Sequence, residues 1–194
     1  MPDMHLLITC HPSPDSLCSQ IARHVAGTIT ANGHPVTVDD LAGLAFNPVV
    51  THAELGSYLQ NRVPADIAPL VDHLRSAWHL IFVLPLWMYG VPALLKGYFD
   101  RVWRPHVTFE IEGDRIRPLL VNVRELTVIV THGMTRAQSE RSGDGTRLLF
   151  SKSLPSVLPN LERNTRFDLY GLDTAAREEI ERELTAIRRH FAKT

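Results

Sequence analysis

Five short apolar segments, each followed by a loop and a helical pattern, recur along this chain and restrict its fold more than any other feature. They occupy residues 6–10, 35–39, 80–84, 126–130 and 166–170. A segment such as Leu6-Leu7-Ile8-Thr9-Cys10 shows no alternation of polar and apolar residues, which is typical of strands covered by helices on both faces. We therefore predict an α/β fold built on a parallel sheet of five strands.

Helical patterns fill the intervals between these segments. Ser16 stands at an N-cap position, and Asn32-Gly33 ends the helix that follows it. Further helices are predicted at about 66–77, 93–103 and 174–191. The 194 residues contain no repeat, low-complexity tract or long linker, so we expect one domain over residues 1–194.

Charge and hydropathy exclude several kinds of partner. The chain carries 20 Lys and Arg against 21 Asp and Glu, so no net field draws it onto nucleic acid or an anionic membrane. No segment approaches the ~20 apolar residues of a membrane span, and the first residues lack the features of a signal peptide. We expect a cytoplasmic protein without stable membrane insertion that binds small molecules.

Three loops are expected to meet beyond the carboxyl ends of the strands, where open α/β sheets bind their ligands. They begin at His11, Pro85 and Thr131. In the first loop, the hydroxyls of Ser13 and Ser16 lie beside the free N–H groups of a helix start, a combination suited to a phosphate. Most serines at such positions serve only as caps. The loop has neither a GxxxxGK[ST] nor a GxGxxG pattern.

The other two loops suggest a flat ligand. The second loop, Pro85 to Pro92, holds two aromatic residues and a methionine, which could pack against the face of an isoalloxazine ring. A turn in the core or at a dimer contact explains these residues equally well. In the third loop, His132 could stabilise negative charge on a reduced flavin or donate a proton to a quinone oxygen, although a lone histidine is more often structural. The broad apolar face of helix 93–103 fits either a homodimer contact or a well-buried helix.

Metal and covalent chemistry find little support. The ten histidines are scattered, without an HExxH or paired His/Cys spacing, so we predict no metal. The chain lacks a GxSxG elbow, and neither Cys10 nor Cys18 has a convincing adjacent base, so covalent catalysis has little support. The reaction is therefore expected to belong to a bound cofactor.

Taken together, these motifs resemble the flavodoxin-like NAD(P)H:quinone oxidoreductases, including the bacterial NAD(P)H dehydrogenases (quinone), over nearly the whole chain. The most specific part runs from Pro85 to Val102, which is similar to the family's proline-aromatic loop and the VPA-LLKG helix after it. The stretch from His11 to Leu17 is similar to the loop that holds the flavin phosphate in the family.

The resemblance implies a flavodoxin-like three-layer sandwich with strand order 2-1-3-4-5, a homodimer, and bound FAD or FMN, with Arg177 and the chain length favouring FAD. It also implies two-electron ping-pong transfer of hydride from NAD(P)H through flavin N5 to a quinone-like acceptor. We predict that His132 and Tyr89 are catalytic. The predicted flavin-binding residues are His11, Ser13, Ser16, Leu17, Cys18, Pro85, Leu86, Trp87, Met88, Tyr89, Thr131, His132, Gly133 and Arg177.

Departures from the family pattern leave some questions open. Met88 stands where a second tryptophan is common, Cys18 where asparagine is common, and no second glycine follows Gly133. The proton donor, the choice between NADH and NADPH, and the physiological acceptor therefore stay open. Two alternative functions also remain: an ancillary flavoprotein subunit that docks on a membrane transporter, and a reductase of azo or nitroaromatic compounds.

Overall fold

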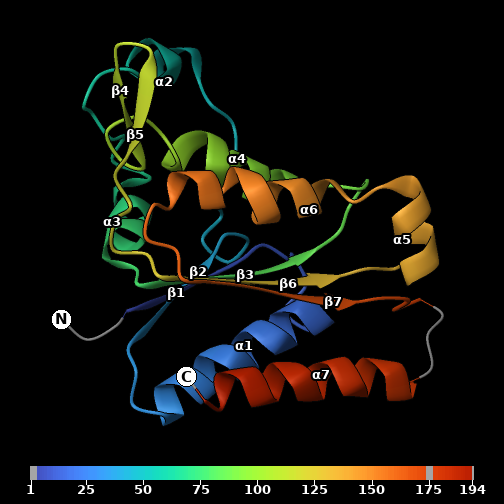
Figure 1. Ribbon diagram of the computed structural model, residues 1–194. Coiled ribbons are helices and arrows are strands. Elements are labelled where there is room, and N and C mark those ends of the chain that lie inside the picture. The colour runs from blue at the N-terminus through green and yellow to red at the C-terminus, as the bar shows by residue number, and fades with distance from the viewer. Residues whose placement is uncertain (1–3, 174–176, 194) are drawn as a thin grey trace.

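The central sheet has the predicted parallel arrangement. The computed structural model describes residues 4–173 and 177–193 (Figure 1). Five parallel strands pair in the order β2-β1-β3-β6-β7, which confirms the predicted α/β class and strand order. Their bounds are β1 His5–Thr9, β2 Val36–Asp40, β3 His79–Pro85, β6 Glu125–Thr131 and β7 Arg163–Leu169.

Helices cover both faces of the sheet and complete three layers (Figure 1). On one face lie α1 (Leu17–Ala31) and α7 (Arg177–Phe191), and on the other lie α3 (Ala68–Ser76), α4 (Ala93–Val102) and α6 (Gly145–Leu148). Predicted helix 174–191 corresponds to α7 from Arg177 onward, since residues 174–176 lie outside the described part. None of the helices in the described ranges has the length and apolar character needed to cross a bilayer.

The ends of α1 follow from its sequence. Ser16 has an extended backbone, and its hydroxyl accepts a hydrogen bond from the Ser19 N–H at 3.1 Å, as an N-cap does. At the other end Gly33 adopts a φ of 85°, which glycine reaches without steric cost. The predicted start and end of this helix are therefore confirmed, and its first turn lies at the carboxyl end of β1.

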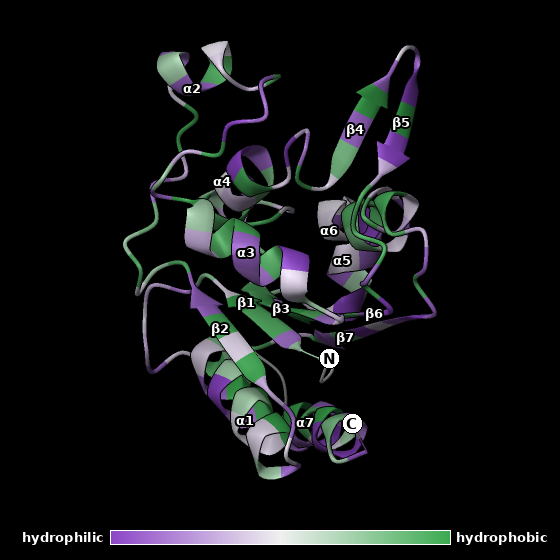
Figure 2. Ribbon diagram, turned by 90° about the vertical axis from the view of Figure 1, so that its left-hand side faces the viewer, coloured by the Kyte–Doolittle hydropathy of each residue, from purple (hydrophilic) through white to green (hydrophobic). Residues whose placement is uncertain are grey.

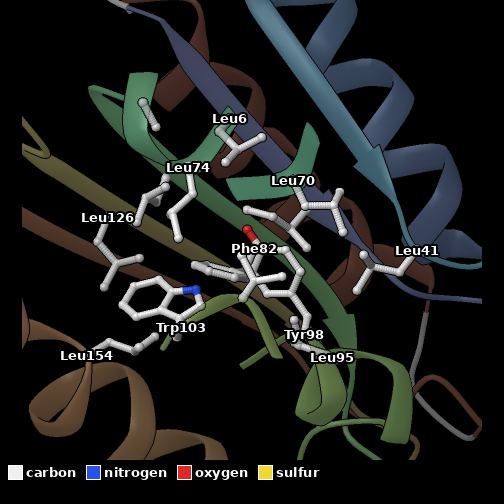
Figure 3. Packing of buried hydrophobic residues seen from close by; sticks show 14 of the residues in the cluster. Leu6, Leu41, Leu70, Leu74, Phe82, Leu95, Tyr98, Trp103, Leu126 and Leu154 are labelled. Carbon is white, nitrogen blue, oxygen red and sulfur yellow. The ribbon is translucent and has the colours of Figure 1, made fainter. Parts of the chain in front are cut away.

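The larger hydrophobic cluster lies between the sheet and the layer that contains α4. Figure 3 shows Phe82 of β3 among leucines and aromatic side chains of this cluster. Tyr98 and Val102 are fully buried, whereas Leu94 and Phe99 are partly buried. Burying a side chain of this size contributes about 1.5–3 kcal/mol. The apolar face of helix 93–103 is thus mostly used within the chain itself.

Three regions were not predicted as regular structure. The polar stretch around Gly113 forms an antiparallel hairpin of β4 (Phe109–Glu112) and β5 (Arg115–Pro118). After the third loop the chain forms further helical turns. These are α5 (Arg136–Ser142), α6, a π-helix (Leu149–Ser153) and a 3₁₀ turn (Pro155–Val157). The third region is the short helix α2 (His52–Gly56), which precedes α3.

A histidine cluster is buried at the amino ends of the strands, away from the three loops. The Nδ1 atoms of His5 and His79 are 3.1 Å apart, and His79 Nε2 lies 2.8 Å from Thr127 Oγ1. Burial, with the nearby His5, His190 and Arg163, lowers the pKa of His79 well below its ordinary value. His79 is therefore held in its neutral form.

Candidate functional site

The three predicted loops come together at the carboxyl ends of the strands. Cys18 Sγ lies 3.0 Å from Thr131 Oγ1, which joins the start of α1 to the end of β6. The rings of His11 and Trp87 meet edge to face with centroids 5.7 Å apart, which joins the first and second loops. The Leu86 N–H donates to the Thr131 carbonyl at 2.8 Å. One site can therefore use residues from all three loops.

The first loop presents a group of hydrogen-bond donors. Ser13 N–H donates to His11 Nδ1 at 3.1 Å, which folds the loop back, and the Ser13 side chain is exposed. Leu17 and Cys18 begin α1, so their N–H groups have no acceptor within the helix. These donors sit at the positive end of a helix of 15 residues, an arrangement that suits a phosphate.

The second loop contains a strained two-residue turn. Trp87 and Gly90 exchange backbone hydrogen bonds of 3.1 and 3.0 Å, while Met88 and Tyr89 between them have φ values of 47° and 61°. The left-handed conformation costs roughly 1–2 kcal/mol for a residue with a side chain. The Gly145 N–H donates to the Tyr89 carbonyl at 2.8 Å, which holds the turn from the start of α6.

This turn displays large apolar side chains to solvent. Met88 is 91% exposed, and Trp87 and Tyr89 are each 45% exposed. Pro85 and Leu86, which precede them, are buried and anchor the loop. Exposed aromatic groups on a constrained loop form an apolar surface for a planar ligand. Trp87, Met88 and Tyr89 are therefore exposed as a flavin contact requires, and their contact with a flavin stays a prediction.

The third loop directs its histidine inward. The His132 side chain is 0% exposed, its Nε2 lies 2.9 Å from Asp168 Oδ1, and its ring stacks on Tyr170 at 4.3 Å. Its Nδ1 is buried without a hydrogen-bond partner among the described residues. These contacts favour the structural interpretation of His132. The predicted proton transfer by His132 stays a prediction.

An ionic network lies behind this loop. Arg166 donates to Asp144 and Asp168 at 2.7 Å each, and Arg147 donates to Asp168 at 3.0 Å. Burial alone would raise the pKa of the Asp168 carboxyl, but His132, Arg166 and Arg147 hold that pKa well below its ordinary value. In the described residues, ligand atoms of His132, Asp144 and Asp168 lie within 4.8 Å of one another. Because two guanidinium groups already neutralise the carboxylates, this group does not resemble a metal site.

The cysteines and Arg177 complete the predicted set. Burial raises the pKa of Cys10 to about 12 and that of Cys18 to about 11, despite the Thr131 hydrogen bond to Cys18. Both thiols are therefore protonated at neutral pH and are poor nucleophiles. Arg177 is the first residue of α7, and its side chain lies outside the described part of the chain.

Sequence reasoning missed the residues that support the loops. Arg166 and Asp168 belong to the predicted last strand, and their spacing places them on one face of it. Two opposite charges at alternate positions of a predicted strand were a usable signal for an ion pair on that face. Gly145 gave no such signal, because its contact with Tyr89 depends on how distant segments fold together.

Fold and site together define a flavodoxin-like domain in which the loop before α1 and an aromatic loop meet at the carboxyl edge of a parallel sheet. The chain belongs to the family described as flavodoxin-like fold, whose model matches residues 4–191.

Relatives and solved structures add to this family assignment. The chain is 32% identical over 175 residues to an uncharacterized NAD(P)H oxidoreductase of Haemophilus influenzae, covering 86% of this chain and 83% of that protein. It is 27% identical over 149 residues to an FMN-dependent NADH:quinone oxidoreductase of Bordetella bronchiseptica, covering 72% and 70%. An NAD(P)H:quinone oxidoreductase from Methanothermobacter marburgensis shares the fold, with a TM-score of 0.81, 23% identity and coverage of 99% and 96%. The resemblance identified in the sequence is confirmed.

Proposed function

We propose that this protein is a flavin-dependent NAD(P)H oxidoreductase that reduces quinone-like acceptors. The observation that carries the proposal is the meeting of the α1 start with the exposed aromatic turn at the carboxyl edge of the sheet. The names of the Haemophilus and Bordetella relatives support the same class of reaction.

The residues present fit a flavin. The N–H groups of Leu17 and Cys18, with the Ser13 hydroxyl, would hold the phosphate, and Ser16 would order the turn through its N-cap bond. Trp87 and Tyr89 would cover one face of the ring and exclude water from it. A bound flavin would supply two-electron transfer, from NAD(P)H in one half-reaction and to the acceptor in the other, which is the ping-pong order.

We propose FMN as the flavin. The name of the Bordetella relative specifies FMN, and the comparisons do not support the preference for FAD that Arg177 suggested. The first loop supplies donors for one phosphate, which is what FMN carries. NADH and NADPH both fit the proposed class of reaction.

Of the two predicted catalytic residues, Tyr89 is the better placed. Its side chain is 45% exposed on the aromatic turn, where its hydroxyl is available to an acceptor stacked on the flavin. His132 is enclosed by its partners. We further propose that residues 1–194 form one flavin-binding domain and that two copies associate, with the partly buried Leu94 and Phe99 at the contact.

Absorbance spectroscopy tests the proposal. Purified protein is titrated with FMN and FAD, then reduced anaerobically with NADH or NADPH, and reoxidised with quinone, azo and nitroaromatic acceptors in turn. We expect saturable FMN binding, bleaching by a nicotinamide donor, and reoxidation that is fastest with quinones. Faster turnover of azo compounds than of every quinone would favour the reductase alternative, and absence of flavin binding would refute the proposal.

A further inference from the structure

A groove of about 520 Å³ lies beside the first loop, between α1 and the edge strand β2. Figure 2 shows β2 lying above α1 at the border of the sheet. We call this cavity the β2 groove and define it by Thr9, His11, Arg23, Ala26, Val38 and Asp40, which all line it. Its volume falls within the roughly 300–1,000 Å³ of small-molecule sites.

The β2 groove and the aromatic turn lie on opposite sides of His11. His11 lines the groove, and its ring contacts Trp87 on the other side. In the sheet, β2 neighbours β1 only, whereas the aromatic turn follows β3 on the other side of β1. A ligand that stacks on a flavin at Trp87 and is long enough to pass His11 would therefore reach the groove.

The lining of the groove combines apolar walls with a few polar groups. Ala22 and Ala26, one helical turn apart, leave space against Val38. Thr9 is 6% exposed, and its hydroxyl oxygen is buried without a hydrogen-bond partner in the described residues. A buried hydroxyl ordinarily has a partner, so Thr9 leaves an unused hydrogen-bonding group in the wall of the groove.

The two charged groups of the groove suit different parts of a nucleotide. Asp40 is the last residue of β2, and its Oδ1 accepts from the Gly43 N–H at 3.2 Å. A carboxylate at the end of the second strand is the group that binds ribose hydroxyls in α/β nucleotide sites. Arg23 Nη1 donates to the Pro14 carbonyl at 2.7 Å, which fixes the guanidinium beside the first loop, where phosphate oxygens would pass.

We propose that the β2 groove binds the adenosine half of the nicotinamide dinucleotide, with Asp40 on the ribose hydroxyls and Arg23 toward the phosphates. The proposal rests on the proposed NAD(P)H oxidoreductase function and adds a specificity. A 2′-phosphate on that ribose would bring negative charge against Asp40, and like charges in contact are unfavourable. The groove therefore selects NADH over NADPH.

Ligand binding is measured first by calorimetry, without using the redox reaction. The probes are 5′-AMP and adenosine 2′,5′-bisphosphate, which differ by the 2′-phosphate. Asp40→Asn removes the charge but keeps the oxygen that accepts from Gly43. Ala26→Phe fills the groove. Asp72→Asn is a charge-matched control, because Asp72 is exposed on α3 in the opposite layer. Circular dichroism confirms that each variant is folded.

We expect the unmodified protein to bind 5′-AMP at least about tenfold more tightly than the bisphosphate. Asp40→Asn should reduce that preference to near unity, Ala26→Phe should weaken both ligands, and Asp72→Asn should change neither. No measurable 5′-AMP binding by the unmodified protein, or an unchanged preference in Asp40→Asn, would overturn the proposal.

Kinetics with a truncated donor separates this proposal from the function it rests on. Reduced nicotinamide mononucleotide lacks the adenosine half, so its kcat/KM should be the same in all variants, while the KM for NADH rises in Ala26→Phe. Reduction by both donors with no effect of either groove variant would retain the oxidoreductase and refute the groove. Binding of 5′-AMP without reduction of flavin by any donor would retain the groove and refute the oxidoreductase.

Discussion

Replacing Gly145 by alanine tests whether the strained aromatic turn depends on its contact with α6. The Gly145 N–H donates to the Tyr89 carbonyl at 2.8 Å. A Cβ at this position would lie 2.8 Å from that same oxygen, whereas ordinary contacts begin at 3.4 Å. The added methyl group and the hydrogen bond therefore cannot both keep their present geometry, and the turn must move away from α6.

The energetic cost can be assembled from general magnitudes. The lost hydrogen bond costs roughly 0.5–1.5 kcal/mol, and relieving the contact costs about 1–2 kcal/mol. Alanine in the first turn of a helix returns up to about 1 kcal/mol. We expect Gly145→Ala to lower the free energy of unfolding by about 1–2 kcal/mol. If Met88 and Tyr89 then leave their left-handed conformation, FMN binding must restore that conformation. The cost of restoring it should raise the Kd for FMN about tenfold.

Gly27→Ala is the matched control. Gly27 lies within α1, and an added Cβ would meet nothing within 4 Å. This variant should gain about 0.5–1 kcal/mol from helix propensity and leave FMN binding unchanged. Urea unfolding and fluorescence titration with FMN measure both quantities. A Gly145→Ala protein with the FMN affinity of the unmodified chain would refute the coupling between α6 and the turn.

Three further predictions concern the phosphate loop, the buried histidines and the third loop. Ser16→Asp should weaken FMN binding at least about tenfold by charge repulsion, while Ser16→Asn, which also caps α1, retains binding; equal titration curves for the two variants would contradict the phosphate assignment. Burial, followed by His5, His190 and Arg163, lowers the pKa of His79 in the folded protein below the unfolded value of 6.5. As the pH falls, His79 therefore takes up a proton in the unfolded chain first. Stability should be full above about pH 6.5 and decline below it, by at most about 1.4 kcal/mol per pH unit for this one group; urea titrations should show a shallower decline for His79→Gln than for the exposed control His24→Gln. His132→Ala should cost about 2–3 kcal/mol through the lost contacts with its buried partners; unchanged stability with slowed acceptor reduction would instead support the catalytic prediction.

Much of the fold was predictable because its strongest signals are local. Strands such as Leu80 to Leu84 are apolar on every residue because both faces are covered, and Ser16 caps α1 through a residue three positions away. The start of α5 was equally local, since Thr135 and Gln138 form a capping box, but it was overlooked.

The environment of the site was less accessible from the sequence. His132 stands 36 residues before Asp168, and nothing near His132 in the sequence indicates that its ring turns inward rather than toward a ligand. The left-handed conformation of Met88 was also unexpected, because few residues other than glycine, asparagine and aspartate adopt it. Both properties depend on contacts that form only when the sheet is assembled.

The aromatic turn has a consequence for the protein before it acquires a cofactor. Backbone hydrogen bonds hold the turn that carries the exposed side chains of Trp87, Met88 and Tyr89. These side chains therefore stay exposed when no flavin ring lies against them. An uncovered apolar surface of this kind favours self-association. Flavin supply during synthesis should therefore govern solubility as well as activity, with newly made chains aggregating less when the cofactor is abundant.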